Sequence, residues 1–179
     1  MRKVKTNLNL RRNVEDLLNA VVIQAADDYR ESAVKLMMEP ENSDALHMMD
    51  ECREFFFSEN FRCFSALRGP DIFYRLDAEQ RQYMERYQYF LEQKMKMLLE
   101  ARAYEKSGLS DTGHLEIAAA AADQVLKISR KDWGVWSPIF RLTTREKKLI
   151  RKLRNRRKKL DEQKKRSERA GVSGAVRQD

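Results

Sequence analysis

Apolar residues recur every three or four positions along almost the whole chain, and no segment shows the convincing alternation of a half-buried strand. Only six Gly and three Pro are present among the 179 residues, so few positions interrupt this pattern. A chain of this length, 42% hydrophobic, suffices for one compact domain with an extension. The sequence therefore predicts an all-α protein, with a compact multi-helix body and a long basic C-terminal helix.

Clear breaks separate the expected helices. Asn13 is placed to cap a first helix over residues 14–38. Ser43 or Asp44 starts a second helix, and Gly69 ends a short third one. The remaining expected elements are a long helix from Asp71 or Asp77 to Lys106, a helix over 114–129, a non-helical connector over 130–140, and a basic helix that begins at a Thr143–Glu146 capping box.

The longer expected helices each carry an apolar face that we expect to be buried. In the first helix this face comprises Val14, Leu17, Leu18, Val21, Val22, Ala25, Tyr29, Ala33 and Leu36. In the second helix it comprises Leu46, Met49, Cys52, Phe55 and Phe56. In the long helix it comprises Tyr83, Tyr87, Phe90, Leu91, Met95, Leu98 and Ala101.

The N-terminal residues lack the apolar core of a signal peptide, and no run of about eighteen apolar residues occurs. We therefore expect a soluble protein with no membrane partner, in the cytoplasm of a bacterial host. Cys52 and Cys63 lie in apolar segments, and in a reducing compartment we interpret both as small buried hydrophobes rather than a disulfide.

Positive charge is concentrated near the C-terminus. The chain has a net charge of +8, and residues 141–169 alone hold fifteen Lys or Arg against four acids, which is +11. Residues 1–140 therefore carry −3, because the last ten residues cancel. This asymmetry indicates an anionic partner and says little about the fold. The expected organisation is a basic N-terminal arm (1–13), a helical body (14–140), a basic helical arm (141–169) and a flexible tail (170–179).

The basic arm, residues 141–169, contains the stretch REKKLIRKLRNRRKKLDEQKKR. Its first half has an apolar stripe that can dock on the body, formed by Leu142, Leu149, Ile150 and Leu153. Five or six phosphate contacts from its second half would account for most of a non-specific DNA affinity. The residues predicted to contact DNA or RNA are Arg151, Arg154, Arg156, Arg157, Lys158, Lys159, Lys164, Lys165 and Arg166.

Two other interpretations of the basic arm stay open. It could bind protein only, including a weak self-association as a coiled coil, or it could be a solvated charged tail. Trp133 and Trp136 lie just before the arm and could stack on bases or anchor the connector to the core. A smaller basic cluster near the N-terminus could extend the same patch; it comprises Arg2, Lys3, Lys5, Arg11 and Arg12.

Residues that could carry catalysis are sparse. Asp71 and Asp77, in PDIFYRLDAEQR, fit helix caps better than the paired metal ligands of a nuclease. Neither a Gly-rich phosphate loop nor a nucleophile motif is present. The spacing of a zinc site is also missing from the only His and Cys residues, His47, Cys52, Cys63 and His114. We expect no enzymatic activity, metal or cofactor.

Residues 14–77 contain three strings, QAADDYRESAVKL, MDECREFFFSENF and LRGPDIFYRL, that resemble small helical proteins of Firmicute phages and prophages. The chain also looks like the anti-CRISPR proteins of gut Firmicutes that block type II CRISPR nucleases. This resemblance implies a non-enzymatic phage anti-defence protein that binds the nuclease complex, DNA or both through the basic arm. The alternative is a phage nucleic-acid-binding protein of replication, packaging or transcription control. LTTREKKLIRKL resembles the opening helix of bacterial helix-turn-helix regulators, but no turn and recognition helix follow.

Overall fold

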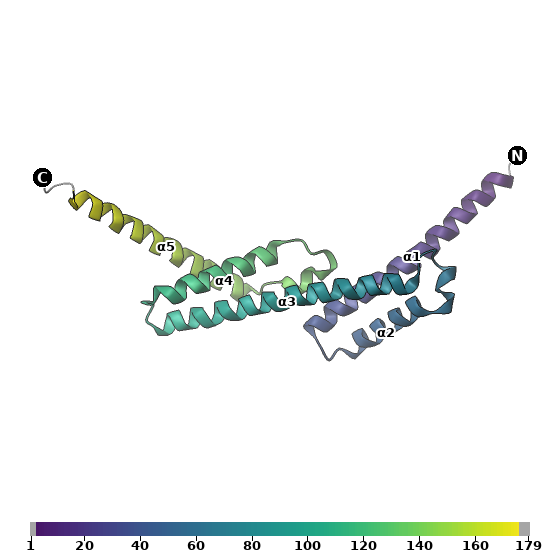
Figure 1. Cartoon of the computed structure of the whole chain (residues 1–179), viewed down its shortest axis with the longest axis horizontal. Coiled ribbons are helices and arrows are strands. Elements are labelled where there is room, and N and C mark those ends of the chain that lie inside the picture. Colours follow the sequence, from purple (N-terminus) through teal and green to yellow (C-terminus); the bar gives the residue numbers. More distant parts are fainter. Residues whose placement is uncertain (1–2, 176–179) are drawn as a thin grey trace. The chain divides into compact units, whose positions relative to one another are not determined.

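The computed structural model describes the backbone of residues 3–175 and the side chains of residues 12–168. Most residues of the expected N-terminal arm and the expected tail therefore lie outside the described side chains. The described part contains only helices and their connections, so the predicted all-α class is confirmed (Figure 1). The elements are α1 (Lys3–Met38), α2 (Ser43–Phe57), η1 (Glu59–Cys63), α3 (Gly69–Lys106), α4 (Thr112–Arg130), η2 (Gly134–Phe140) and α5 (Thr144–Ala175), where η marks a 3₁₀-helix. None of the described helices is long and apolar enough to cross a membrane.

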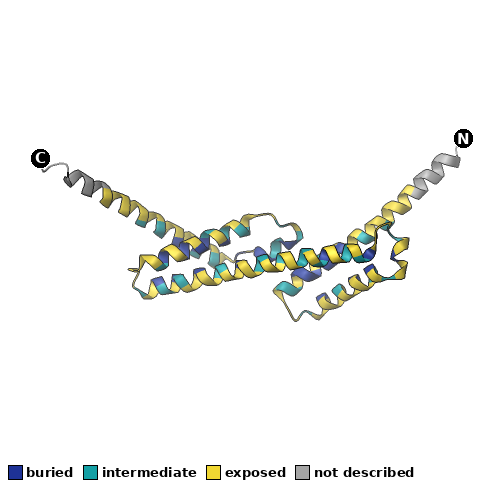
Figure 2. Cartoon of the chain, in the orientation of Figure 1, coloured by how far each residue is buried: buried dark blue, intermediate teal, exposed yellow. Residues whose placement is uncertain are grey.

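The chain forms two compact units, and the boundary between them falls within α3. Unit 1 comprises Met1–Tyr87 and Trp133–Ile139. Unit 2 comprises Gln88–Asp132 and Phe140–Asp179. Each unit has its own set of buried residues (Figure 2).

Unit 1 is built around aromatic side chains from α1, α2, η1 and the first turns of α3. The aromatic rings of Phe55, Phe56 and Phe61 lie within 5.7 Å of one another, centroid to centroid. On α1, Tyr29 meets Phe73 edge to face, and its hydroxyl donates a 2.7 Å hydrogen bond to Gln80 Oε1. Burial raises the pKa of Tyr29 to about 12. The buried residues at the centre of this core are Ala26, Tyr29, Cys52, Phe56, Phe61 and Leu76.

Helix α1 starts before Asn13, so the prediction that Asn13 caps it is wrong. Its expected buried face is also only half right, because Val14, Leu17 and Val21 are exposed. The reason is length: α1 spans about 54 Å and α2 only about 22 Å at 1.5 Å per residue. Helix α2, which lies beside α1, therefore covers only the C-terminal part of it (Figure 1).

Several helix boundaries differ from those expected. The short third helix is the single 3₁₀ turn η1, and α3 begins at Gly69 itself. Asp71 lies in the first turn of α3, and Asp77 lies inside the helix, where it pairs with Arg81; neither caps the helix start. Helix α2 is capped by Asn42, whose side chain accepts a hydrogen bond from the Ala45 backbone N–H.

The two cysteines differ in environment. Cys52 is buried, as predicted, and burial raises the pKa of its thiol to about 11. A thiol that stays protonated near neutral pH is a poor nucleophile and a poor metal ligand. Cys63 is exposed, so its predicted burial is wrong. The 3₁₀ turn of η1 directs Phe61 rather than Cys63 into the core of unit 1.

Unit 2 contains the second half of α3, α4 and most of α5. The side chain of Asp111 caps α4 by accepting a hydrogen bond from the Gly113 N–H. The buried face of α4 is rich in alanine, and small side chains allow the α5 backbone to approach closely. The buried residues of α4 are Leu115, Ala118, Ala119, Ala121, Ala122 and Val125.

An ionic contact joins the end of α3 to the start of α4. His114 Nδ1 lies 2.6 Å from Glu100 Oε2, and His114 Nε2 lies 3.7 Å from Asp111 Oδ2. The hydrogen bond to Glu100, with the nearby charge of Asp111, raises the pKa of His114. The contact therefore stabilises unit 2 fully below the ordinary histidine value of about 6.5, while Glu100 stays ionised, and is lost as pH rises through the folded value.

We expect replacement of His114 by Gln to lower the unfolding temperature of unit 2 at about pH 6 and to have less effect at about pH 8.5. Both tryptophans, Trp133 and Trp136, belong to unit 1, so tryptophan fluorescence would not follow the unfolding of unit 2. Far-ultraviolet circular dichroism is therefore the suitable measurement. A difference between H114Q and the wild type that stays constant across this range would contradict the assignment.

Candidate nucleic-acid interface

Helix α5 begins with the predicted capping box. The Thr143 N–H donates to Glu146 Oε2 at 2.7 Å, and the Glu146 N–H donates to Thr143 Oγ1 at 3.2 Å. Lys94 Nζ of α3 lies 2.6 Å from the other carboxylate oxygen of Glu146. Burial alone would raise the pKa of Glu146, but the contacts with Lys94 and Thr143 outweigh it and lower that pKa. The start of α5 is therefore fixed both by its own residues and by α3.

The predicted apolar stripe holds the first half of α5 in unit 2. Leu142, Ile150 and Leu153 are buried, and Leu149 is half-buried. Helices α4 and α5 lie side by side along this stripe (Figure 1). The predicted docking of the stripe is confirmed.

Acidic residues of α3 and α4 pair with cations of α5. Asp123 binds two arginines: Arg154 Nε at 3.1 Å and Arg157 Nη2 at 2.8 Å. Further along, Lys164 Nζ lies 2.9 Å from Glu116 Oε1. Arg156 has no such ion pair in the described part, but its guanidinium lies 5.6 Å from the centroid of the Tyr104 ring. Spacing within α5 alone leaves these cations largely uncompensated. For Arg154, Arg157 and Lys164 that interpretation is wrong, because their carboxylate partners lie on α4.

A groove of about 810 Å³ runs between the end of α4 and one face of α5. We call it the basic groove. Its charged residues are six cations and one acid. The lining residues are Leu126, Ser129, Arg130, Leu142, Lys147, Ile150, Arg151, Arg154, Asn155, Arg157, Lys158 and Asp161.

Four cations of the basic groove remain available to a ligand. Among the described side chains, no carboxylate lies within ion-pair distance of Arg130, Lys147, Arg151 or Lys158. The last three stand on one helical face, at spacings of four and seven residues, so they rise by about 6 Å and 10 Å along the axis. The other two arginines that line the groove, Arg154 and Arg157, are held by their ion pairs with Asp123. The groove therefore presents a row of positive charge in a hollow of the surface.

The structure brings together only some of the predicted contact residues. Arg151, Arg154, Arg157 and Lys158 line the basic groove. Lys165 stands on the same helical face, seven residues beyond Lys158. The other predicted residues, Arg156, Lys159, Lys164 and Arg166, do not line it.

Sequence reasoning missed two cations of the groove, Lys147 and Arg130. Lys147 shares a helical face with Arg151, and this spacing could have found it. Arg130 ends α4 and reaches the groove only because α4 packs on α5, so no local pattern in the sequence indicates it.

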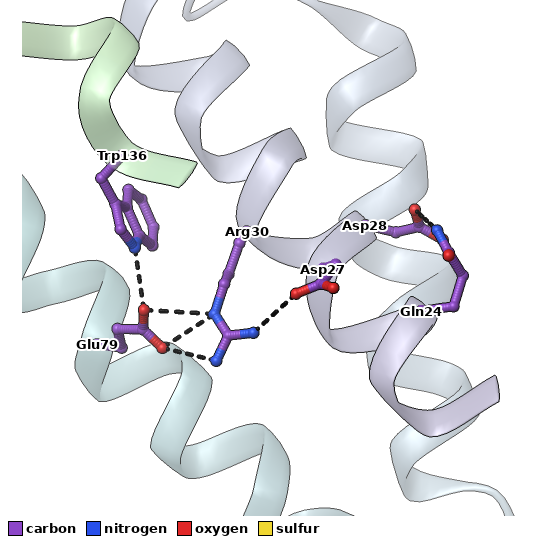
Figure 3. Close-up of polar contacts among 6 residues, drawn as sticks. All are labelled: Gln24, Asp27, Asp28, Arg30, Glu79 and Trp136. Carbon is purple, nitrogen blue, oxygen red and sulfur yellow. Dashed lines mark hydrogen bonds and ion pairs between the residues drawn. The ribbon is translucent and has the colours of Figure 1, made fainter. Parts of the chain in front are cut away.

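The two tryptophans belong to unit 1 and are engaged there. Trp136 is buried, stacks on Tyr83 with ring centroids 4.6 Å apart, and donates a 2.9 Å hydrogen bond from Nε1 to Glu79 Oε1. The same carboxylate accepts hydrogen bonds from Arg30 of α1 (Figure 3). Trp133 meets Tyr83 edge to face. The two roles predicted for these tryptophans were stacking on bases and anchoring the connector. The contacts described here are those of an anchor. The connector itself is the 3₁₀-helix η2, not the non-helical segment expected.

Groups that could hold a metal ion are missing from the described residues: no three His, Cys, Asp or Glu side chains cluster suitably. Two acidic residues of α1 have partners on the same helix: Asp27 pairs with Arg30 at 3.0 Å, and Asp28 accepts a hydrogen bond from Gln24 (Figure 3).

Comparisons with protein-family models, curated proteins and solved structures found no match to this chain.

Proposed function

We propose that this chain is a non-enzymatic protein that binds the phosphate backbone of a nucleic acid in the basic groove, and that this contact serves to inhibit a type II CRISPR nuclease complex. The observation that carries the first part is the groove, where four cations without described carboxylate partners line one hollow. Cations so placed repel one another until an anion enters, which makes an anionic polymer a favourable occupant.

The lining of the groove indicates how a nucleic acid would be contacted. No aromatic side chain is among the residues that line it, so bases have no surface there on which to stack. Arginine and lysine on one face of a helix suit phosphates, which carry no sequence information. We therefore expect backbone contacts to a duplex, with little dependence on base sequence.

The second part of the proposal is supported by the resemblance of residues 14–77 to phage proteins and of the chain to type II anti-CRISPR proteins. A type II effector exposes both a guide–target heteroduplex and a protospacer-adjacent duplex, so a phosphate-binding protein has nucleic acid to contact in that complex. A plain nucleic-acid-binding protein of a phage would use the same groove without the nuclease.

The first part is tested by fluorescence anisotropy of a labelled DNA duplex titrated with the full chain over a salt series. If the four available cations each neutralise one phosphate, log K falls with log salt at a slope of about −3.6. Binding that disappears at about 100 mM salt, or that shows no salt dependence, would refute the groove as a phosphate site.

The second part is tested by adding the full chain to a reconstituted type II nuclease, its guide and a cleavable target. Inhibition at protein concentrations well below those that coat the free target supports the nuclease complex as partner. Binding of the duplex without any inhibition would favour the plain nucleic-acid-binding protein instead.

A further inference from the structure

The part of α3 that belongs to unit 2 has two apolar faces. One face is buried and consists of Phe90, Met97, Ala101 and Tyr104. The other face lies on a different side of the helix. Its residues are Leu91, Met95, Leu98 and Leu99. We call this second face the α3 stripe. A helix that is apolar on two sides is normally covered on both.

The α3 stripe is exposed, although the sequence predicts that Leu91, Met95 and Leu98 belong to the core. Their exposed fractions are 40%, 63% and 37%, and that of Leu99 is 57%. The physical reason is that unit 2 places α4 and α5 against the other face only. Much of the second half of α3 is coloured as exposed in Figure 2. Large apolar residues gathered on one exposed face mark an interaction surface.

The spacing of the stripe fits a partner helix. Leu91, Met95 and Leu98 follow the alternating four- and three-residue steps of a coiled-coil seam, and Arg102 occupies the next seam position. The long aliphatic stem of an arginine can cover an apolar residue while its guanidinium reaches a neighbouring acid.

Charges beside the stripe decide the direction of that partner. Glu92 lies at its N-terminal end and Arg102 at its C-terminal end, and both are exposed. Neither forms an ion pair among the described side chains. A parallel copy of the same helix would place like charges side by side. An antiparallel copy centred between Met95 and Leu98 places Glu92 of each chain within about one residue of Arg102 of the other.

We propose that the α3 stripe pairs with the same stripe of a second copy of this chain, antiparallel, to form a homodimer. The seam has the Met95 and Leu98 side chains of both copies at its centre and a Glu92–Arg102 ion pair at each end. Because it covers about three turns of helix, the dimer depends on protein concentration. This self-association lies on α3, whereas the sequence interpretation placed a weak coiled coil on the basic arm.

Sedimentation velocity of the full chain over a hundredfold range of concentration tests the dimer. The single variants Glu92→Arg and Arg102→Glu each bring like charges together twice in the dimer, so we expect each to raise its dissociation constant about tenfold or more. The double variant E92R/R102E exchanges the charges and restores the dissociation constant to within about threefold of the wild type.

The matched control is Lys96→Glu, which reverses an exposed charge on α3 that lies off the stripe. Circular dichroism checks that every variant is folded, and M95E/L98E in the stripe should be monomeric throughout. A wild-type chain that is monomeric at all concentrations overturns the proposal. A double variant that associates no better than the single variants overturns it equally, because only antiparallel pairing predicts the rescue.

Discussion

Substitution of Gly69 by Ala is expected to destabilise unit 1 by about 3 kcal/mol or more. Gly69 begins α3, and a Cβ added there would lie 1.9 Å from the carbonyl oxygen of Phe56 and 3.0 Å from Cδ1 of Phe61. The carbonyl cannot simply move away, because Phe56 is fully buried in the core of unit 1. Alanine is the better helix former by about 1 kcal/mol, but the backbone clash is the larger effect.

The tryptophans make this effect measurable for unit 1 alone. Trp133 and Trp136 both lie in unit 1, so their fluorescence follows that unit, while circular dichroism follows both. We expect the fluorescence transition of G69A to shift down by about 15 °C, on the scale of a unit of fewer than 100 residues.

Gly113→Ala supplies the matched control for G69A. Its added Cβ would meet only the side chain of Asp111, at 3.1 Å. Because Gly113 lies in unit 2, circular dichroism follows this variant, and its transition should stay within about 2 °C of the wild type. Equal fluorescence transitions for G69A and the wild type would show that Gly69 and Phe56 do not approach as closely as described.

Charge reversal in the basic groove is expected to have the largest effect on nucleic-acid binding. The double variant R151E/K158E replaces two of the four available cations by acids and leaves the Asp123 contacts intact. We expect the affinity for a DNA duplex at about 100 mM salt to fall about a hundredfold or more, and the salt slope to flatten by about 1.8. Fluorescence anisotropy over a salt series measures both quantities.

The matched control is K148E/K159E, which makes the same change in net charge on exposed positions of α5 outside the groove. If the groove is the contact surface, this variant keeps most of the wild-type affinity. If both double variants lose affinity equally, the nucleic acid responds to the total charge of α5, and the groove has no special role.

Much of the fold follows from local sequence. Helix α4 itself was predictable, because its alanine-rich run favours helix by itself. The start of α5 was predictable too, because the capping residues Thr143 and Glu146 lie within three residues of each other. The stripe that docks α5 was equally predictable, since Leu142, Ile150 and Leu153 stand out in a charged segment. Helix boundaries were less predictable. Gly69 and Pro70 were expected to end a short helix, yet they begin α3, where a proline is well tolerated in the first turn.

The candidate site depended on contacts between helices. Arg157 and its partner Asp123 are 34 residues apart, and Lys164 and Glu116 are 48 apart, so no helical spacing reveals which cations of α5 are paired. Local periodicity likewise identifies α3 as apolar but gives both of its faces the same signal. The chain's own sequence determined which segments are helical, because hydrogen bonding and capping act within a few residues. Only the tertiary structure decided which cations remain available and which apolar face stays exposed, because ion pairing and burial depend on which helices meet in space.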